Sequence, residues 1–319
     1  MNNLPVSRRK MLRNSAVAAL GLSLTSCMQL RDSAAGRPKR VLFFTKSSGY
    51  EHSAIKRNGG KPSFAEQVLA ELGPKHNLEF TFSKDGSLFT PKYLDQFDAF
   101  FFYTTGDLTT EGTDKNPPMT AEGKQAFIDA VKHGKGFIGT HSGADTFHTR
   151  PDPADKSTRY QTNGDKSDPY VLMLGGEFIK HGPQQVAKMR VVDSKFPGLE
   201  NVEASFAFQE EWYSLKEFQP NLHVLLVQET EGMKGEEYQR GPYPATWART
   251  CGKGRVFYTS MGHREDVWMN EVFQKILLGG INWAVRNVNA DVTPNLEQAA
   301  PKCHELPPKP APVAPKKKA

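Results

Sequence analysis

The sequence predicts an α/β fold in which helices cover both faces of a mostly parallel sheet. Three near-continuous apolar runs, 40–45, 97–103 and 136–140, have the composition of strands that are buried on both faces. Segments with helical apolar spacing, 64–72 and 120–131, lie between these runs. Strands that alternate with helical segments form βαβ units, and such units build a parallel sheet with right-handed crossovers.

The elements of the first half can be placed one by one. Segment 64–72 has apolar residues on one face and stops before a proline, which cannot continue a helix. Segment 78–82 alternates in polarity as a strand does, and Thr120 is the expected N-cap of helix 120–131. The expected product is a doubly wound, flavodoxin-like layer whose functional edge carries the loops 46–52, 104–118 and 141–165.

The second half is less regular and extends this layer. The run 267–285 has the broadest apolar face and predicts one long helix. The other predicted elements are a helix over 168–174, strands over 185–192 and 222–228, and a β-hairpin whose strands are 245–250 and 254–260. No change in composition requires a second domain, so we expect one folded domain over residues 39–287.

The composition is that of a globular protein. Of the 319 residues, 38% are hydrophobic and 24% are charged, which is typical of a domain with an apolar core. The net charge of +6 comes largely from the two ends, where Arg8, Arg9 and the final lysines 316–318 lie. No basic stripe interleaved with aromatic residues lies between them, so nucleic-acid binding is not expected.

The N-terminus has the plan of an export signal. The pair Arg8-Arg9 precedes a short apolar segment, 16–24, that is too short to span a bilayer as a helix. This pair resembles the twin-arginine signal, which a receptor reads as an address. The apolar segment runs into LTSC (24–27), which resembles a lipobox in which Cys27 becomes the lipidated first residue of the mature protein.

These features predict a signal peptide over 1–27 and a tether over 28–38. The protein is then expected in the cell envelope or periplasm, held at the membrane by a lipid anchor on Cys27. The alternative is a soluble periplasmic protein in which this cysteine is incidental.

The chain closes with a Pro- and Lys-rich segment that has little to bury. Residues 288–319 are therefore expected to be disordered or extended. Cys251 and Cys303 can pair in an oxidising compartment or remain free thiols. Neither lies in a C-x-x-C or C-x-x-C-H sequence, so thiol redox chemistry and covalent haem are not favoured.

Several histidines lie at the ends of predicted strands or in the loops that follow them. They are His52, His141, His148, His181 and His263. Such positions can converge at the carboxyl edge of an open α/β sheet, where ligands bind. Neutral histidines with a carboxylate such as Glu210 or Glu211 can ligate Zn²⁺ or another transition ion. The same residues can instead hydrogen-bond a polyhydroxylated substrate, with one histidine as general base.

Other chemistries lack their motifs. The chain has no H-E-x-x-H, no G-x-S-x-G elbow, no P-loop and no G-x-G-x-x-G after the first strand. Ser142 directly follows His141 and is the weaker candidate for the functional group. Asp107 and Asp145 are candidate orienting residues, and the structural alternative for Asp145 is a loop cap or Asx turn.

Five further segments of the chain form a joint pattern. They are the loop GYEH (49–52), GFIGTHSGADTF (136–147), LGGEFIKHGP (174–183), EEWY (210–213) and PATWARTCGKGRVFYTSMGH (244–263). Together, these segments resemble the ThuA-like, or trehalose-utilisation, family, and the resemblance covers residues 39–286.

The resemblance implies a class I glutamine amidotransferase-like, flavodoxin-like α/β fold. It also implies a role in carbohydrate metabolism, often beside sugar dehydrogenases that make 3-keto sugars. The amidotransferases carry a cysteine nucleophile at the elbow after a central strand, whereas this chain has Thr140-His141-Ser142 there, so glutamine hydrolysis is not expected. Glu210 stands where an aspartate is expected, which leaves the choice between Glu210 and Glu211 open. The residues on the family's motifs are His52, His141, Asp145, His181, Glu211 and His263.

We therefore expect an exported enzyme that acts on 3-keto glycosides, as a lyase, isomerase or hydrolase. A ketone at C3 acidifies the neighbouring C–H, whose proton a histidine or glutamate base can abstract. The expected catalytic residues are His141, Glu211 and Asp145.

The remaining residues are expected to bind the sugar or a metal. The expected substrate-binding residues are His52, His181, His263, Tyr213 and Trp247. A divalent metal such as Zn, Mn or Fe, if bound, would polarise the carbonyl. Its ligands would come from His52, His141, His181, His263 and Glu211. The alternative function is a non-catalytic carbohydrate-binding lipoprotein of the cell envelope, in which Trp212, Tyr213 and Trp247 stack on sugar rings.

Overall fold

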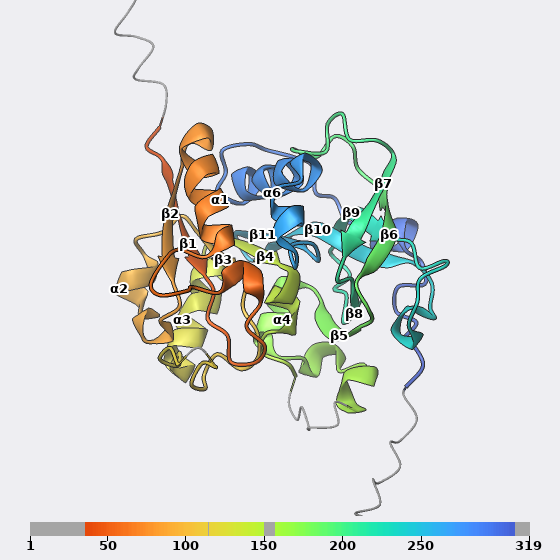
Figure 1. Cartoon of the computed structure of the whole chain (residues 1–319), viewed down its shortest axis with the longest axis horizontal. Coiled ribbons are helices and arrows are strands. Elements are labelled where there is room, and N and C mark those ends of the chain that lie inside the picture. Colours follow the sequence, from red (N-terminus) through yellow and green to blue (C-terminus); the bar gives the residue numbers. More distant parts are fainter. Residues whose placement is uncertain (1–35, 114, 150–156, 310–319) are drawn as a thin grey trace, which may run out of the picture. The chain divides into compact units, whose positions relative to one another are not determined.

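A nine-stranded sheet forms the centre of the computed structural model, which describes residues 36–113, 115–149 and 157–309 (Figure 1). Its strands are β1 (Lys39–Phe44), β2 (Leu78–Ser83), β3 (Ala99–Phe102), β4 (Gly136–Thr140), β6 (Gln185–Val191), β7 (Ser205–Glu210), β9 (His223–Gln228), β10 (Tyr243–Cys251) and β11 (Gly254–Thr259). A separate antiparallel pair joins β5 (Glu177–His181) to β8 (Tyr213–Lys216).

Helices connect and cover these strands. The α-helices are α1 (Phe64–Leu72), α2 (Pro91–Leu94), α3 (Ala121–Lys132), α4 (Pro169–Leu174), α5 (Glu265–Trp268), α6 (Glu271–Ala284) and α7 (Leu296–Ala299). Short 3₁₀ helices are η1 (Ser53–Ile55), η2 (Gly73–His76), η3 (Gly86–Leu88), η4 (His141–Asp145), η5 (Ser157–Tyr160), η6 (Gly164–Lys166) and η7 (Glu236–Tyr238).

The strand order is β2-β1-β3-β4-β11-β10-β9-β6-β7. The five strands from β2 to β11 are parallel to their neighbours, and every pair from β11 to β7 is antiparallel. The flavodoxin-like α/β fold with its large mixed sheet is confirmed, including the hairpin of β10 and β11. The carboxyl ends of β1, β3, β4 and β11 lie at the same edge because these strands are parallel.

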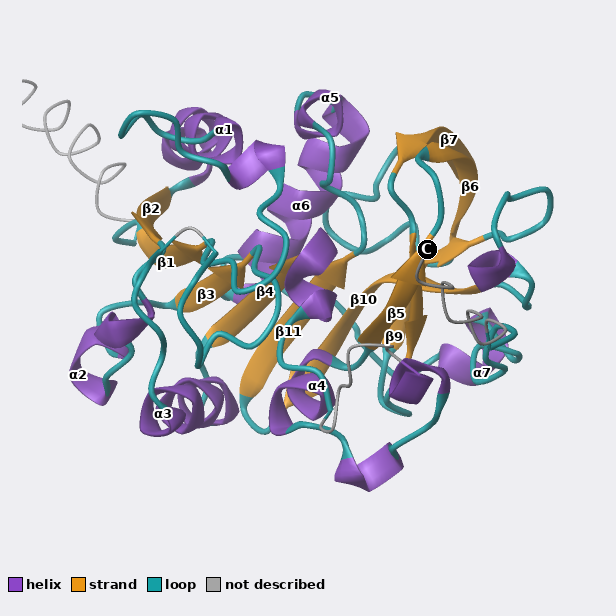
Figure 2. Ribbon diagram, turned by 60° about the horizontal axis from the view of Figure 1, so that its bottom comes forward, coloured by secondary structure: helices purple, strands orange, loops and turns teal. Residues whose placement is uncertain are grey.

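Figure 2 shows α1, α5 and α6 on one face of the sheet, and α2, α3 and α4 on the other. Successive strand residues point to opposite faces, so each buried strand supplies both cores. Phe43 and Ile138 belong to the core under α6, whereas Phe44 and Phe137 belong to the core on the opposite face. All four side chains are fully buried, which stabilises the fold by about 1.5–3 kcal/mol each.

Local sequence signals set the helix boundaries in the first half. Ser63 and Glu66 form a capping box at the start of α1, and the Thr120 side chain accepts from the Gly123 amide at the start of α3. Helix 64–72 and strand 136–140 have the predicted bounds.

The prediction of one helix over 267–285 is wrong. The structure has α5 and α6 there, separated at Met269-Asn270. The Asn270 side chain accepts hydrogen bonds from the amides of Val272 and Phe273, and it therefore starts a new helix where the apolar pattern continues without a break.

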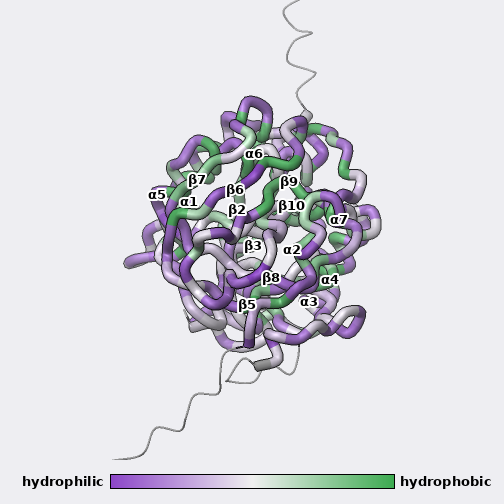
Figure 3. The backbone as a smooth tube through the Cα atoms, turned by 90° about the vertical axis from the view of Figure 1, so that its right-hand side faces the viewer, coloured by the Kyte–Doolittle hydropathy of each residue, from purple (hydrophilic) through white to green (hydrophobic). Residues whose placement is uncertain are grey.

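Three strands escaped prediction. These are β5, β7 and β8, which are four to six residues long and hold charged or polar residues among apolar ones. The longer apolar run of β9 is more easily recognised, and it is coloured as hydrophobic in Figure 3.

The expected disorder of residues 288–319 is not found in their described part, 288–309. Leu296 and Cys303 are buried in the core under α7, although the composition around them is polar and proline-rich. Side chains of the main domain hold this segment, since Arg240 donates to the Cys303 carbonyl and His223 donates to the Thr293 carbonyl. Residues 310–319 lie outside the described residues.

The structure shows whether the two remaining cysteines are paired, but it does not describe the predicted signal peptide. Cys251 and Cys303 are free thiols. The signal peptide, Cys27 and the tether up to residue 35 lie outside the described residues. Within the part of the chain that the structure describes, no helix has the length and apolar character needed to cross a membrane.

Candidate functional site

Four predicted site residues converge at the carboxyl edge of the parallel strands. His141 directly follows β4, His263 follows β11, and His52 lies in the loop after β1. Glu211 enters from the antiparallel half, directly after β7. One donor atom from each of these four residues lies within 4.8 Å of the others.

Short distances connect three members of this His/Glu cluster. The Nδ1 atom of His263 lies 3.1 Å from Nε2 of His141 and 3.2 Å from Oε2 of Glu211. Nε2 of His141 lies 3.4 Å from the same Glu211 oxygen. The imidazole rings of His52 and His141 meet edge to face, with centroids 4.8 Å apart. Three imidazoles and one carboxylate form a donor set that suits a divalent transition ion.

The backbone at His141, directly after β4, has a strained conformation. Its φ is +43°, in the left-handed region that non-glycine residues rarely adopt. Nδ1 of His141 donates to the Ser260 carbonyl at 3.1 Å, and the Tyr258 hydroxyl donates to the His141 carbonyl at 2.8 Å. Because Nδ1 carries the hydrogen, the neutral ring presents the lone pair of Nε2 to Glu211 and His263.

Burial keeps two of the histidines neutral. Desolvation, followed by the neighbouring His141 and His263, lowers the pKa of His52 well below its ordinary value. Desolvation also lowers the pKa of His141, although the nearby Glu211 carboxylate opposes this shift. Nδ1 of His52 is buried without a hydrogen-bond partner. These imidazoles are therefore available as neutral ligands at neutral pH.

Glu211 carries the negative charge of the cluster, and His263 hydrogen-bonds to it. Burial would raise the pKa of Glu211, but the adjacent imidazoles of His141 and His263 outweigh burial and hold the pKa far below its usual range. Burial would lower the pKa of His263, but the bond to Glu211 raises it instead. Gln184 donates to Nε2 of His263 at 3.0 Å, so Nδ1 of His263 holds a proton toward Glu211. A bound cation would replace this proton.

The neighbouring glutamate, Glu210, hydrogen-bonds to the backbone of the loop after β11. Glu210 is fully buried and accepts hydrogen bonds from the amides of Gly262, His263 and Glu211 at 2.8, 3.1 and 2.7 Å. Burial raises its pKa to about 7, although these amides oppose the shift. Of the two glutamates left open by the sequence, Glu211 thus faces the cluster, whereas Glu210 fixes the loop that carries His263.

The cluster opens onto a pocket of about 350 Å³. Its lining residues are Tyr50, His52, Asp145, Phe178, His181, Gln184, Glu211, Tyr213 and His263. His181 lies outside the four-residue cluster, with Nδ1 at 3.4 Å from Oε1 of Glu211. The same Nδ1 donates to the Gly182 carbonyl at 2.9 Å, so Nε2 of the neutral ring is an acceptor.

Aromatic rings form one wall of this pocket. The ring of Tyr213 lies 4.2 Å from that of His141 and 4.1 Å from that of Phe178, centroid to centroid. No described residue hydrogen-bonds to the Tyr213 hydroxyl, whose pKa is raised well above its ordinary value by burial and then by Asp145 and Glu211. Tyr50 stands at the rim with 69% of its surface exposed and meets His52 edge to face.

Asp145 lines the same pocket but belongs to a second charged group. Its Oδ1 accepts from Nε2 of His148 at 2.5 Å and from the Arg159 guanidinium at 3.0 Å. On its other side, His148 donates from Nδ1 to Glu177 at 3.0 Å, and Lys216 lies 3.3 Å from Glu177. Asp145 therefore does not join the four-residue cluster.

The expectation that Trp247 binds the sugar is wrong, because Trp247 is fully buried in the core. Its indole N–H donates to the Leu174 carbonyl, and its ring packs on Tyr258. Trp212, named with it as a stacking residue, is also fully buried. The residue type alone did not indicate that these two tryptophans are buried.

The sequence reasoning missed Tyr50, Phe178 and Gln184 as pocket residues. Phe178 and His181 are three positions apart in β5, so a regular strand would place them on opposite faces. An irregularity in the pairing of β5 with β8 between Phe178 and Lys180 brings both side chains to the pocket. For Tyr50, the sequence offered one indication, which was its position two residues before His52 in the same loop.

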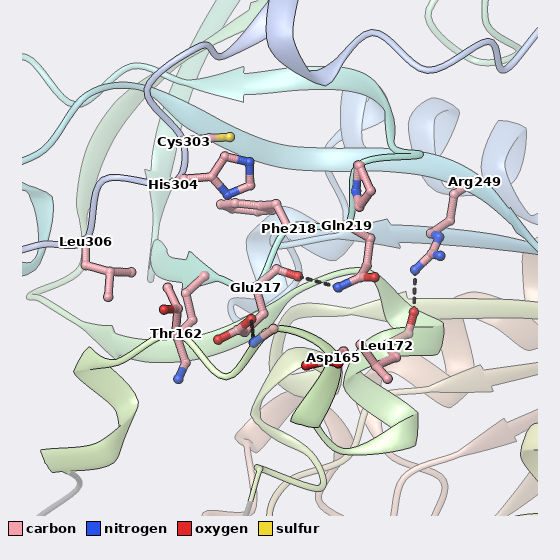
Figure 4. Close-up of a pocket in the computed structure, with 13 residues that line it drawn as sticks. Thr162, Asp165, Leu172, Glu217, Phe218, Gln219, Arg249, Cys303, His304 and Leu306 are labelled. Carbon is pink, nitrogen blue, oxygen red and sulfur yellow. Dashed lines mark hydrogen bonds between the residues drawn. The ribbon is translucent and has the colours of Figure 1, made fainter.

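A larger pocket of about 630 Å³ lies elsewhere and holds none of the predicted site residues. Figure 4 shows Glu217, Phe218, Arg249 and His304 among its lining residues. The Arg249 guanidinium donates to the Leu172 carbonyl, and Glu217 accepts from the amides at residues 163 and 164. The charged groups of Arg249 and Glu217 are therefore hydrogen-bonded to backbone groups of the protein itself.

The fold and the site define a flavodoxin-like α/β protein with a candidate transition-metal centre at its strand ends. The family model for trehalose utilisation, ThuA, matches residues 40–284. The chain belongs to this family.

Solved structures share the fold. A protein from Bacteroides uniformis described as ThuA-like has a TM-score of 0.55 and 18% identity, over 79% of this chain and 93% of that one. A second ThuA-like protein, from Parabacteroides merdae, has a TM-score of 0.51 and 16% identity, over 83% of this chain and 97% of that one. Among curated proteins, none matches this chain.

Proposed function

We propose that this chain is a metal-assisted enzyme that acts on 3-keto glycosides. The observation that carries the proposal is the convergence of His52, His141, His263 and Glu211 within 4.8 Å at the base of a pocket. Membership of a trehalose-utilisation family supports a carbohydrate as the substrate. The pocket volume of about 350 Å³ is at the small end of ligand sites, as one sugar ring requires.

The donor set fits a divalent Zn, Mn or Fe ion. Neutral imidazoles and a carboxylate are suitable ligands, and the buried Nδ1 of His52 has no protein partner. The carboxylate of Glu211 supplies one negative charge to balance the ion. When bound, such an ion acts as a Lewis acid toward a carbonyl oxygen and stabilises negative charge that develops there.

His181 is the best placed general base. We expected His141 and Glu211 in the acid–base roles, but His141 is fully buried and both belong to the proposed ligand set. His181 lies beside them and lines the pocket, and its Nδ1–H is held by the Gly182 carbonyl. Its Nε2 lone pair can therefore accept a proton from the substrate.

The proposed reaction is an elimination next to the ketone. The base takes the proton at C2 of the 3-keto sugar, and the electron pair of that C–H bond forms a C1–C2 double bond. The C1–O bond breaks, its electron pair stays on the leaving oxygen, and this oxygen takes up a proton. The Tyr213 hydroxyl lines the pocket and keeps its proton at neutral pH because burial raises its pKa, so it is an O–H group that can donate there. Return of the proton without bond cleavage would give isomerisation.

Metal content and turnover test the proposal together. The mature protein, purified without chelator, is expected to hold about one equivalent of Zn, Mn or Fe by elemental analysis. It is expected to convert methyl 3-keto-glucopyranoside to an enone, which absorbs in the ultraviolet. His181→Gln should lower the turnover number by about 10²- to 10⁴-fold and leave the metal content unchanged. His76→Gln, at an exposed histidine, is the matched control.

Two results would contradict this proposal in different ways. Full activity in a protein stripped of metal would exclude the metal from the reaction. Saccharide binding without turnover, under every metal tested, would favour the carbohydrate-binding lipoprotein.

We further propose that the protein is exported and lipid-anchored, on the basis of Arg8-Arg9 and Cys27. Replacement of Cys27 by Ser is expected to move the protein from the membrane fraction to the soluble fraction. Lys-Lys in place of Arg8-Arg9 is expected to keep the protein in the cytoplasm. Unchanged fractionation of the first variant would contradict the anchor, and unchanged export of the second would contradict the twin-arginine route.

A further inference from the structure

The carboxylate of Asp145 is held from one side only. Its Oδ1 accepts two charged donors, His148 at 2.5 Å and Arg159 at 3.0 Å. No described residue bonds to Oδ2. The Asp145 side chain is 21% exposed and lines the pocket, so Oδ2 is the acceptor that it offers there.

A buried chain of alternating charges fixes this orientation. It runs from Asp145 through His148 and Glu177 to Lys216, with contacts of 2.5, 3.0 and 3.3 Å. The side chains of His148, Glu177 and Lys216 are 5%, 2% and 1% exposed. Charges this well buried are retained only where each has a partner. The chain therefore fixes the Asp145 carboxylate as an acceptor, with both donors on its Oδ1 atom.

The surroundings of Asp145 fit one class of ligand. Phe178 and Tyr213 present aromatic surface in the same pocket, and the Arg159 guanidinium lies 5.5 Å from the centre of the Phe178 ring. An acceptor-only carboxylate beside an apolar ring face suits a ligand with hydroxyl donors and an apolar C–H face. A pyranose ring has both features.

We infer that Asp145 is a specificity-determining residue whose carboxylate accepts hydrogen bonds from the C4 or C6 hydroxyl of the sugar ring. This inference rests on the proposed function, because C1, C2 and C3 react and must face the His/Glu cluster. The hydroxyls at C4 and C6 are then the donors left for the rest of the pocket. His148 and Arg159 act through Asp145 and are positioning residues.

Deoxy sugars test this contact. The ligands are methyl 3-keto-glucopyranoside and its 4-deoxy and 6-deoxy derivatives, tested on wild type, Asp145→Asn and His148→Gln. For wild type, one deoxy derivative should show a KM about 10- to 100-fold above that of the parent. Asp145→Asn should raise the KM of the parent glycoside by a similar factor. The variant should then have about the same KM for the parent and for that deoxy derivative. Its kcat and its metal content should change little.

Controls separate recognition from folding. Asp193→Asn removes the carboxylate of another Asp–His pair, Asp193 and His223 at 3.0 Å, which does not line the pocket, and should leave every KM unchanged. His148→Gln should raise KM with little change in kcat, which a general loss of structure would not do.

The outcomes distinguish this inference from the proposed function. If no protein turns the glycosides over, the proposed function fails, and calorimetric binding of the same ligands then replaces KM. The inference is overturned if Asp145→Asn still distinguishes the deoxy derivatives as wild type does. It is also overturned if wild type binds none of the three ligands.

Discussion

The buried charge chain makes stability depend on pH in a specific direction. His148 lies between Asp145 and Glu177. Burial would lower its pKa, but the hydrogen bonds to Asp145 and then Glu177 outweigh burial and raise the pKa. Stabilisation by a raised histidine pKa is fully present below the unfolded value of about 6.5 and is lost as the pH rises through the folded value.

We predict that His148→Gln destabilises the protein more at pH 6 than at pH 9. Loss of one partner of a buried ion pair costs about 3–5 kcal/mol. The lower end applies here, because Asp145 keeps Arg159 and Glu177 keeps Lys216. About 3 kcal/mol corresponds to a fall in melting temperature of roughly 6–12 °C at pH 6. At pH 9 the cost should approach that of lost neutral hydrogen bonds, about 1–2 kcal/mol.

Urea unfolding of both proteins at pH 6, 7.5 and 9 measures this difference. His76→Gln, at an exposed histidine, should change stability little at any of these pH values. A loss for His148→Gln that stays constant from pH 6 to 9, or grows with pH, would refute the assignment of a charged His148 in the folded protein.

Three further predictions concern metal binding, the C-terminal segment and a helix boundary. Glu211→Gln should weaken binding of Zn²⁺ by more than about 100-fold in a competition titration with a chelator, whereas the exposed Glu203→Gln should not. Leu296→Ala, in the segment expected to be disordered, should cost about 2–4 kcal/mol in urea unfolding because Leu296 is 2% exposed; a loss below about 1 kcal/mol would count against its packing. Asn270→Ala should cost about 1 kcal/mol by the same assay through loss of the α6 cap, and no loss would indicate that the cap contributes nothing.

The parallel half of the fold was predictable from its sequence because its strands are buried on both faces. A continuous apolar run such as that of β4 has few other interpretations when helical segments flank it. The convergence of His52, His141 and His263 followed from the same observation, since parallel strands end at one edge.

Other features depend on contacts that no local pattern reports. The pairing irregularity in β5 places Phe178 beside His181, and the capping side chain of Asn270 divides an apolar stretch into two helices. Leu296 and Cys303 are buried in the core, and Arg240 and His223 bind backbone carbonyls of the segment that contains them, although the composition of that segment is polar. Trp247 shows the reverse error, since an aromatic residue suited to a sugar serves the core.

The two halves of the sheet make the site jointly, and this explains the pair of adjacent glutamates. The parallel strands supply the three histidines of the four-residue cluster, and its carboxylate comes from the antiparallel half. The antiparallel extension ends in β7, whose last residue, Glu210, bonds to the amides of Gly262 and His263 after β11. That attachment places the next residue, Glu211, against the imidazoles. Without Glu210 the His141 imidazole would still be present, but the end of β7 that carries Glu211 would lose its hydrogen bonds to the loop that carries His263. Glu210 is thus the residue through which the fold fixes the fourth donor of the cluster.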